Sequence, residues 1–148
     1  MNEKKYRIGY TTGVFDLFHI GHLNILKNAK EQCDYLIVGV STDELVEKYK
    51  HKKPVISYEE RSAIVQAISY VDEVVPQYTM DKYAAWKELK YDALFHGDDW
   101  KNSDMYNKYI KEFEGTGVDF VFLPHTDGTS STMLTSILSE IRDNMKGE

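Results

Sequence analysis

Two histidines, His19 and His22, stand three residues apart, where a strand-like run over residues 6–11 gives way to a helical pattern over residues 20–32. This spacing puts both imidazoles on one side of the first helical turn. A helix start also offers unpaired backbone N–H groups and a partial positive charge, and Gly21 lets a ligand approach the backbone closely. The segment therefore predicts a phosphate site with two donors that can follow charge as it develops.

The same loop lacks the two commoner phosphate-binding patterns. Residues 11–22 contain neither G-x-G-x-x-G nor G-x-x-x-x-G-K-[ST]. A dinucleotide fingerprint and a P-loop are therefore not indicated.

A second candidate anion site lies near the end of the chain. Ser130, Ser131 and Thr132 stand at the expected start of the last helix, where backbone N–H groups and hydroxyls can receive phosphate oxygens. Ordinary helix capping explains the same residues, and the two roles are compatible.

Basic and acidic side chains accompany these loops. Four lysines lie in a polar stretch over residues 41–55, which we read as a loop after the second strand, and one or two of them are expected to reach phosphate: Lys48, Lys50, Lys52 and Lys53. Arg61 follows a capping-box pattern that begins at Ser57, and a guanidinium can donate two bonds at once to phosphate. Asp98 and Asp99 follow the expected fourth strand and could hold Mg²⁺, order their loop or cap a helix.

Strand and helix patterns alternate along the chain. The expected strands cover residues 6–11, 34–40, 72–76, 92–96 and 118–123. The expected helices cover residues 20–32, 57–69, 81–89, 101–114 and a segment from Ser131 onward. The last helix carries an apolar stripe that predicts packing: Leu134, Ile137, Leu138 and Ile141. This alternation predicts an α/β fold, a doubly wound five-stranded parallel sheet with helices on both faces, whose ligand lies beyond the carboxyl ends of the strands.

Composition narrows the class of protein. The 148 residues suit one domain covering residues 1–148, and a net charge of −6 argues against broad nucleic-acid binding. No apolar run approaches the roughly 20 residues needed to cross a bilayer, and the charged N-terminus does not resemble a signal peptide, so we expect no membrane partner and a cytoplasmic protein. The single cysteine, Cys33, is expected to be a buried residue at the end of a helix.

Several segments of the chain, taken in order, resemble the motifs of a known family. Residues 15–22, Phe-Asp-Leu-Phe-His-Ile-Gly-His, resemble the H-x-G-H signature of the nucleotidyltransferase superfamily. Further segments look like the cytidylyltransferase family within it, most of all the branch acting on glycerol 3-phosphate: Val-Ser-Thr-Asp-Glu at 40–44, Tyr-Glu-Glu-Arg at 58–61, Tyr-Val-Asp-Glu-Val at 70–74, Gly-Asp-Asp-Trp at 97–100 and Thr-Asp-Gly-Thr-Ser-Ser-Thr at 126–132.

The resemblance implies a Rossmann-like nucleotidyltransferase that joins CTP and a phosphorylated small alcohol, best glycerol 3-phosphate, into a CDP-alcohol and pyrophosphate. It implies Mg²⁺ arriving with CTP, no dedicated protein metal site, and a homodimer. The residues that it makes catalytic are His19, His22, Lys48, Arg61, Ser131 and Thr132. The further residues that it places at the nucleotide are Gly13, Val14, Phe15, Asp16, Lys50, Gly97, Asp98, Asp99, Trp100, His125, Thr126, Gly128 and Ser130.

The chain departs from this family pattern at three positions. Ser69 and His125 stand where the family has arginines, and Val14 replaces a usual threonine. These changes leave other acceptors open, among them phosphocholine and phosphoethanolamine, and leave ATP open as the donor. A non-catalytic nucleotide-binding module is a second hypothesis, and a flavodoxin-like or receiver domain is a third.

Overall fold

The computed structural model describes residues 4–97, 103–124 and 130–146, except for the side chains of residues 131 and 146. Within these residues, five parallel strands form one sheet in the order β3-β2-β1-β4-β5. The strands are β1 (Tyr6–Gly13), β2 (Cys33–Ser41), β3 (Glu73–Gln77), β4 (Ala93–Gly97) and β5 (Asp119–Leu123). The strand order reverses between β1 and β4, so the carboxyl ends of these two strands frame the expected ligand crevice.

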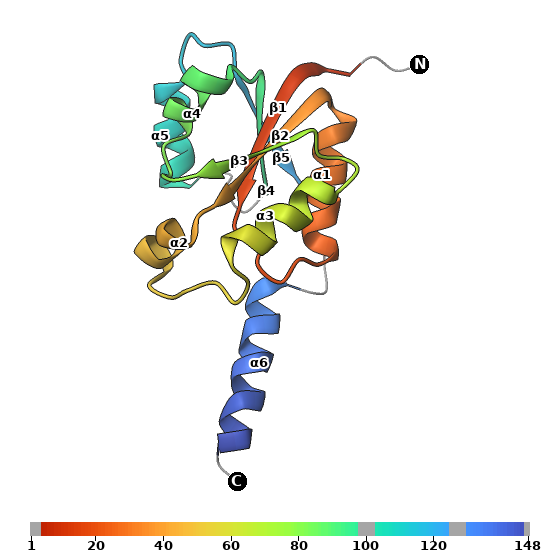
Figure 1. The fold of residues 1–148 in the computed structure, drawn as a ribbon. Helices are drawn as coiled ribbons and strands as arrows, with labels where there is room; N and C mark the ends of the chain where they lie inside the picture. Colours follow the sequence, from red (N-terminus) through yellow and green to blue (C-terminus); the bar gives the residue numbers. More distant parts are fainter. Residues whose placement is uncertain (1–3, 98–102, 125–129, 147–148) are drawn as a thin grey trace.

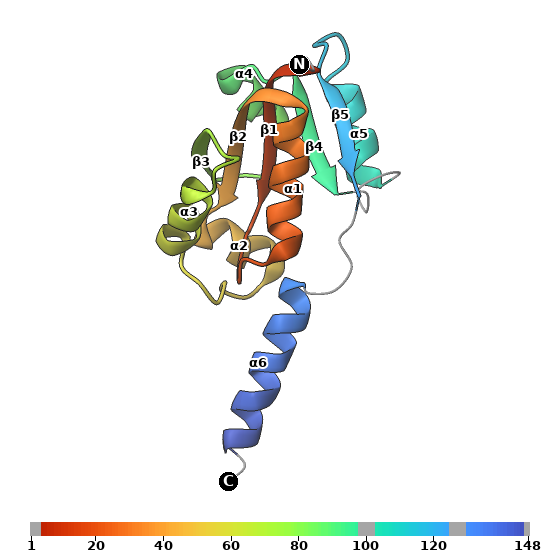
Figure 2. The same cartoon turned by 90° about the vertical axis from the view of Figure 1, so that its right-hand side faces the viewer.

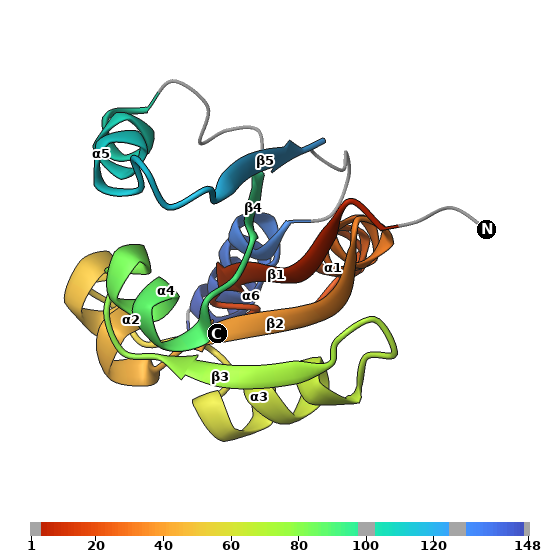
Figure 3. The same cartoon turned by 90° about the horizontal axis from the view of Figure 1, so that it is seen from above.

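The structure contains six helices among the described residues, four of which cover the two faces of this sheet (Figures 1 and 3). They are α1 (Ile20–Glu31), α2 (Asp43–Lys50), α3 (Tyr58–Ala67), α4 (Lys82–Leu89), α5 (Asp104–Glu112) and α6 (Ser131–Lys146). Helices α1 and α3 lie on one face and α4 and α5 on the other (Figures 1 and 3). The prediction of a doubly wound α/β fold is therefore confirmed. Among the described residues, no helix is both long and apolar enough to cross a bilayer.

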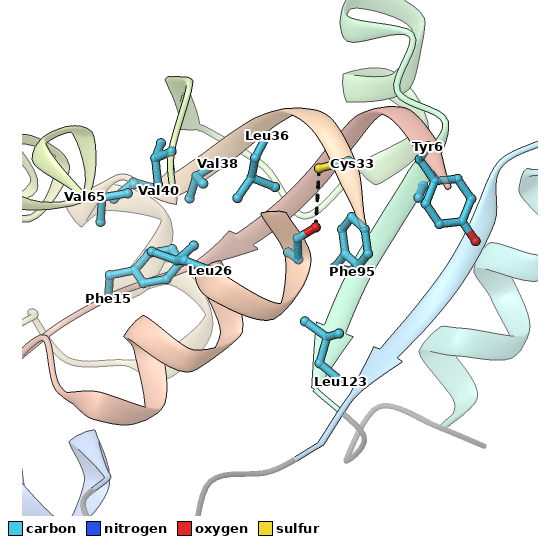
Figure 4. Close-up of a cluster of buried hydrophobic side chains, with 13 residues drawn as sticks. Tyr6, Phe15, Leu26, Cys33, Leu36, Val38, Val40, Val65, Phe95 and Leu123 are labelled. Carbon is cyan, nitrogen blue, oxygen red and sulfur yellow. Dashed lines mark hydrogen bonds between the residues drawn. The ribbon is translucent and has the colours of Figure 1, made fainter. Parts of the chain in front are cut away.

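Apolar side chains fill the two layers between sheet and helices. On the α1 and α3 side, Leu26 and Val65 pack with Phe95 and their neighbours in a cluster that also contains Phe15 (Figure 4). On the other side, rings from α4, α5 and the strands pack together around Phe113, which contacts the rings of Tyr83, Trp86, Tyr91, Tyr109 and Phe120. Strand β2, which lies between β3 and β1, is buried on both faces from Leu36 to Ser41, which explains its nearly continuous apolar sequence.

Cys33 is buried, as expected, but its position was predicted wrongly. It is the first residue of β2 rather than the last of a helix, and its thiol donates to the carbonyl of Ala29 (Figure 4). The helix ends at Glu31, one residue before the predicted end, because the chain turns at Gln32 to enter the sheet.

The lysine-rich stretch after β2 is also not a simple loop, because it contains α2. Thr42 caps this helix by accepting from the backbone N–H of Leu45. Acidic residues occupy its first turn and basic residues its last, which complements the helix dipole. Only two apolar side chains, Leu45 and Val46, are buried and hold this helix against the domain, and the charged residues around them obscure the helical pattern in the sequence.

The apolar stripe of α6 does not pack into the core as the sequence predicted. The helix starts at the carboxyl edge of the sheet and runs away from it (Figures 1 and 2). Ile137, Leu138 and Ile141 are consequently 46%, 47% and 50% exposed. The periodicity correctly indicated a helix, but the direction in which that helix leaves the sheet decides what its stripe meets.

Candidate active site

A cavity of about 510 Å³ opens at the carboxyl ends of β1 and β4. The first turn of α1 and the first turn of α6 both contribute to its wall, although about 110 residues separate them in sequence. The sequence-predicted residues that line it are Gly13, Val14, Phe15, Asp16, His19, His22, Lys50, Gly97, Ser130 and Thr132. The two predicted anion sites are thus parts of one cavity.

The loop between β1 and α1 is held in shape by the core. Phe15 and Leu17 adopt left-handed backbone conformations, with φ of 56° and 53°, which non-glycine residues seldom occupy. Phe15 is only 5% exposed and anchors the turn in the hydrophobic core. At Gly13, an added Cβ would lie 3.0 Å from the Phe15 ring, so a side chain here would require that buried ring to shift. Packing energy therefore fixes the turn that leads into the histidines.

His19 and His22 form a reciprocal cap at the start of α1. Nδ1 of His19 accepts from the backbone N–H of Gly21 at 3.0 Å, and Nδ1 of His22 accepts from the backbone N–H of His19 at 3.2 Å. The two rings stack loosely, with centroids 4.0 Å apart. Because both Nδ1 atoms accept, neutral rings carry their proton on Nε2, at the opposite edge.

Burial keeps both histidines neutral. Desolvation lowers the pKa of His19 below its ordinary value. The pKa of His22 is lowered to about 4, chiefly by burial and also by the neighbouring His19, while Asp16 opposes the shift. At neutral pH the pair therefore acts through Nε2–H donors and the helix dipole rather than as two cations.

Arg61 was predicted to contact phosphate, but its side chain is fully buried and does not line the cavity. Its guanidinium donates to the carbonyls of Ile56, Val14 and Ser41 at 2.7–2.8 Å and pairs with Asp43. These contacts join three chain segments around the cavity. The geometry therefore gives Arg61 a positioning role instead of direct contact with a ligand.

Of the four lysines expected near phosphate, only three line the cavity. Lys50, Lys52 and Lys53 line the cavity, whereas Lys48 is exposed on α2 and is not part of the lining. Tyr49, which the sequence did not single out, also contributes to the wall.

The other predictions lie partly outside the described residues. Those for Asp98, Asp99, Trp100, His125, Thr126 and Gly128 fall there, as does the side chain of Ser131. Ser130 is described and caps α6, since its hydroxyl accepts from the backbone N–H of Met133 at 3.1 Å. Ser69, one of the replaced arginine positions, is exposed just after α3 and does not line the cavity.

The sequence reading missed the wall on the β3 and β4 side. Gln77, Met80 and His96 line the cavity there. His96 was not predicted because it lies inside β4, whereas ligand contacts were expected only from the residues just after each strand. Side chains alternate between the two faces along a strand, so His96 lies on the α4 and α5 face together with Leu94, which is apolar.

Lys82 is the second missed residue. It opens α4, is only 1% exposed, and its Nζ has no hydrogen-bond partner among the described residues. Burial lowers the pKa of Lys82 to about 7. The pKa of His96 is lowered mainly by burial and secondly by the positive charge of Lys82. Lys82 lines a smaller cavity of about 220 Å³ that shares Gln77 with the main one. No pattern around an isolated helix-start lysine signals such burial.

Comparison with known proteins assigns the class. The sequence model of the Cytidylyltransferase-like family matches residues 10–136, so the chain belongs to that family. Glycerol-3-phosphate cytidylyltransferase of Bacillus spizizenii is 39% identical over 132 residues, which cover 88% of this chain and 96% of that protein. Ethanolamine-phosphate cytidylyltransferase of Dictyostelium discoideum is 36% identical over 140 residues, covering 90% of this chain but 36% of that longer protein.

Solved structures agree on the fold. The crystal structure of a lipopolysaccharide core biosynthesis protein from Thermoplasma volcanium superposes with a TM-score of 0.69 at 24% identity, covering 84% of this chain and 99% of that one. This likeness supports the architecture alone.

The histidine cap makes a testable prediction about pH. Protonating Nδ1 of His22 destroys its bond from the His19 N–H, so His22 resists protonation in the folded state. Its folded pKa is depressed, so its contribution to stability is present above its ordinary pKa of 6.5 and is lost as pH falls toward about 4. Histidine ring resonances followed by NMR should show a midpoint near 4 that disappears in a His22→Asn variant. A midpoint for His22 at or above 6.5 would contradict the cap.

Proposed function

We propose that this protein transfers the cytidylyl group of CTP to a phosphorylated small alcohol, with glycerol 3-phosphate as the preferred acceptor. One observation carries the proposal: the starts of α1 and α6 line a single cavity, with a neutral histidine pair at the first of them. Two helix dipoles directed at one space suit a polyphosphate. The similarity to glycerol-3-phosphate cytidylyltransferases over nearly the whole chain supports the choice of reaction.

The reaction needs alignment and charge neutralisation more than proton abstraction. A phosphate monoester is already an anionic nucleophile near neutral pH. Its oxygen attacks the α-phosphorus of CTP in line, a new P–O bond forms, the α–β anhydride bond breaks, and pyrophosphate leaves. In this proposal Nε2–H of His19 and of His22 donates to oxygens of the α-phosphate, where negative charge grows in the transition state. The start of α6, with Ser130, Ser131 and Thr132, receives the leaving phosphates.

The acceptor occupies the β3 and β4 side of the cavity in this proposal. Lys82 supports it, because a buried ammonium group lacking a described partner is the group that a phosphate dianion would stabilise. Gln77 and His96 offer further polar atoms at the same wall.

Magnesium would enter with the nucleotide. No cluster of three or more metal-ligating side chains occurs among the described residues. This fits Mg²⁺, which retains several waters and is held largely by substrate phosphates with one or two carboxylates. In this proposal the ion would neutralise the triphosphate charge, and Asp98 and Asp99, which lie outside the described residues, would provide a supporting contact.

We also propose a cytoplasmic homodimer. The half-exposed stripe of α6 supports self-association, because exposed apolar side chains in a row mark interaction surfaces. A single buried, unpaired cysteine fits a reducing compartment. A sedimentation mass of two chains is the expected result, and a monomer at all concentrations would contradict the dimer.

The activity itself is tested by pyrophosphate release with each pairing of CTP or ATP and glycerol 3-phosphate, phosphocholine or phosphoethanolamine. We expect turnover with CTP and glycerol 3-phosphate to exceed every other pairing in kcat/KM by at least about tenfold, the effect of one well-placed charged contact. Turnover of none of the pairs, despite a melting shift with CTP, would favour a nucleotide-binding module instead.

The acceptor side is tested by Lys82→Met, which keeps the buried volume and removes the ammonium. We expect KM for glycerol 3-phosphate to rise roughly tenfold at pH 7 while KM for CTP stays the same. In the wild type, Lys82 loses its proton above about pH 7, so KM for the acceptor should rise with pH there, and this rise should vanish in the variant. Lys87→Met, at an exposed position of the same helix, is the control. An unchanged acceptor KM in Lys82→Met would exclude the contact.

A further inference from the structure

We infer that Asp16 is a positioning residue that fastens a lysine-bearing strap, residues 50–57, along the rim of the cavity. The inference rests on the proposed function in one respect only, the identity of the nucleotide as CTP. Through this contact, Asp16 sets where the strap lysines stand relative to the triphosphate. Asp16 thus serves nucleotide binding indirectly, whereas the sequence analysis placed it in direct contact with the nucleotide.

The carboxylate of Asp16 holds two consecutive backbone amides of the strap. Oδ2 accepts from the N–H of Val55 at 2.7 Å, and Oδ1 accepts from the N–H of Ile56 at 2.9 Å. Asp16 belongs to the β1–α1 loop, 39 and 40 residues earlier in the chain. Hydrogen bonds to an ionised acceptor are about twice as strong as neutral ones, so this contact couples the strap to the loop that carries the histidines.

The same strap peptide is gripped from its other side. The carbonyl of Ile56 accepts from Nε of Arg61 at 2.8 Å, and Nη1 of Arg61 also donates to the carbonyl of Val14. Ile56 is therefore fixed by a carboxylate at its N–H and by a guanidinium at its C=O. Just beyond it, Asp43 accepts from the N–H of Tyr58 and orients the start of α3.

This attachment determines the placement of charge. Lys50, Lys52 and Lys53 lie between the end of α2 and the Asp16 contact, and all three line the cavity. α2 ends at His51 in a left-handed turn with φ of 58°, so the chain reverses there and returns across the rim. Without the contact at Val55 and Ile56, the lysines would depend on the end of α2 and on Arg61 alone for their position.

The contact also explains how a negatively charged residue can line a site for an anion. Asp16 lines a cavity proposed to receive a polyphosphate, and an uncompensated carboxylate there would repel it. Two backbone donors turn that negative charge toward the strap. A carboxylate is thus tolerable beside an anion site because its oxygens are engaged by the segment that carries the cations.

The test compares Asp16→Asn and Asp16→Ala with the wild type. An asparagine oxygen can accept from one amide but its NH₂ group cannot accept from the other, and alanine loses both contacts. We expect KM for CTP to rise roughly tenfold in Asp16→Asn and further in Asp16→Ala, with kcat within about threefold and the acceptor KM unchanged. Trypsin cleavage after Lys50 and Lys52 should accelerate by a comparable factor, and CTP should slow it.

Asp72→Asn is the matched control. Its carboxylate accepts from the backbone N–H of Leu36 at 2.7 Å, near the amino ends of the strands and away from the cavity. This variant should change neither KM for CTP nor strap cleavage, although it removes the charge from a carboxylate that binds a backbone amide and pairs with Lys30. If all three variants unfold at a lower midpoint, this shared loss of stability cannot explain why KM for CTP rises only in the Asp16 variants.

Two results would overturn the inference. One is strap cleavage and KM for CTP that match the wild type in Asp16→Ala. The other is a fall in kcat with KM for CTP unchanged, which would place Asp16 in the chemical step. If the wild type itself turned over no CTP, the proposed function would fail, while the cleavage rates of the Asp16 variants would still decide whether the strap contact exists.

Discussion

The site depends on two hydrogen bonds in which histidine side chains accept from the backbone at the start of α1. They satisfy two of the N–H groups that a helix start leaves unpaired, and they fix the tautomer of both rings. A change at His19 or His22 therefore affects the geometry of the helix start as well as the chemistry. The loop before them bears its unusual backbone conformation because Phe15 is held in the core, so hydrophobic packing ultimately aims the imidazoles.

Because the histidines are neutral, the attraction for anions must come from elsewhere. Helix dipoles contribute at the two helix starts that line the cavity, and the strap lysines near α2 add positive charge at its rim. Lys82, whose pKa burial lowers to about 7, lines the smaller cavity that shares Gln77 with the main one. Arg61, a fully buried cation, does not line the cavity but holds together the segments around it. The strap lysines and Lys82 are thus two separate cationic groups in two cavities that share Gln77, and two such groups suit a reaction between two anions.

The sheet, its parallel strands and the histidine pair could be predicted because they rest on local signals, namely apolar runs, capping residues and spacing. α2 could not, because its apolar anchor is two residues long and lies within a lysine run. The exposed stripe of α6 shows the limit of periodicity, which reveals a helix but not its direction. Arg61, Lys82 and His96 were misjudged or missed because burial of a polar side chain depends on tertiary neighbours, which a single sequence does not display.

The central claim is that Nδ1 of His19 holds the helix start while its Nε2–H serves the reaction. The most direct measurement is kcat for His19→Asn alongside its unfolding midpoint. The asparagine oxygen can replace Nδ1 as a cap but does not reach the position of Nε2. The account predicts a midpoint close to that of the wild type and a kcat lower by about a hundredfold or more. An unaltered kcat with the helix start intact would contradict it.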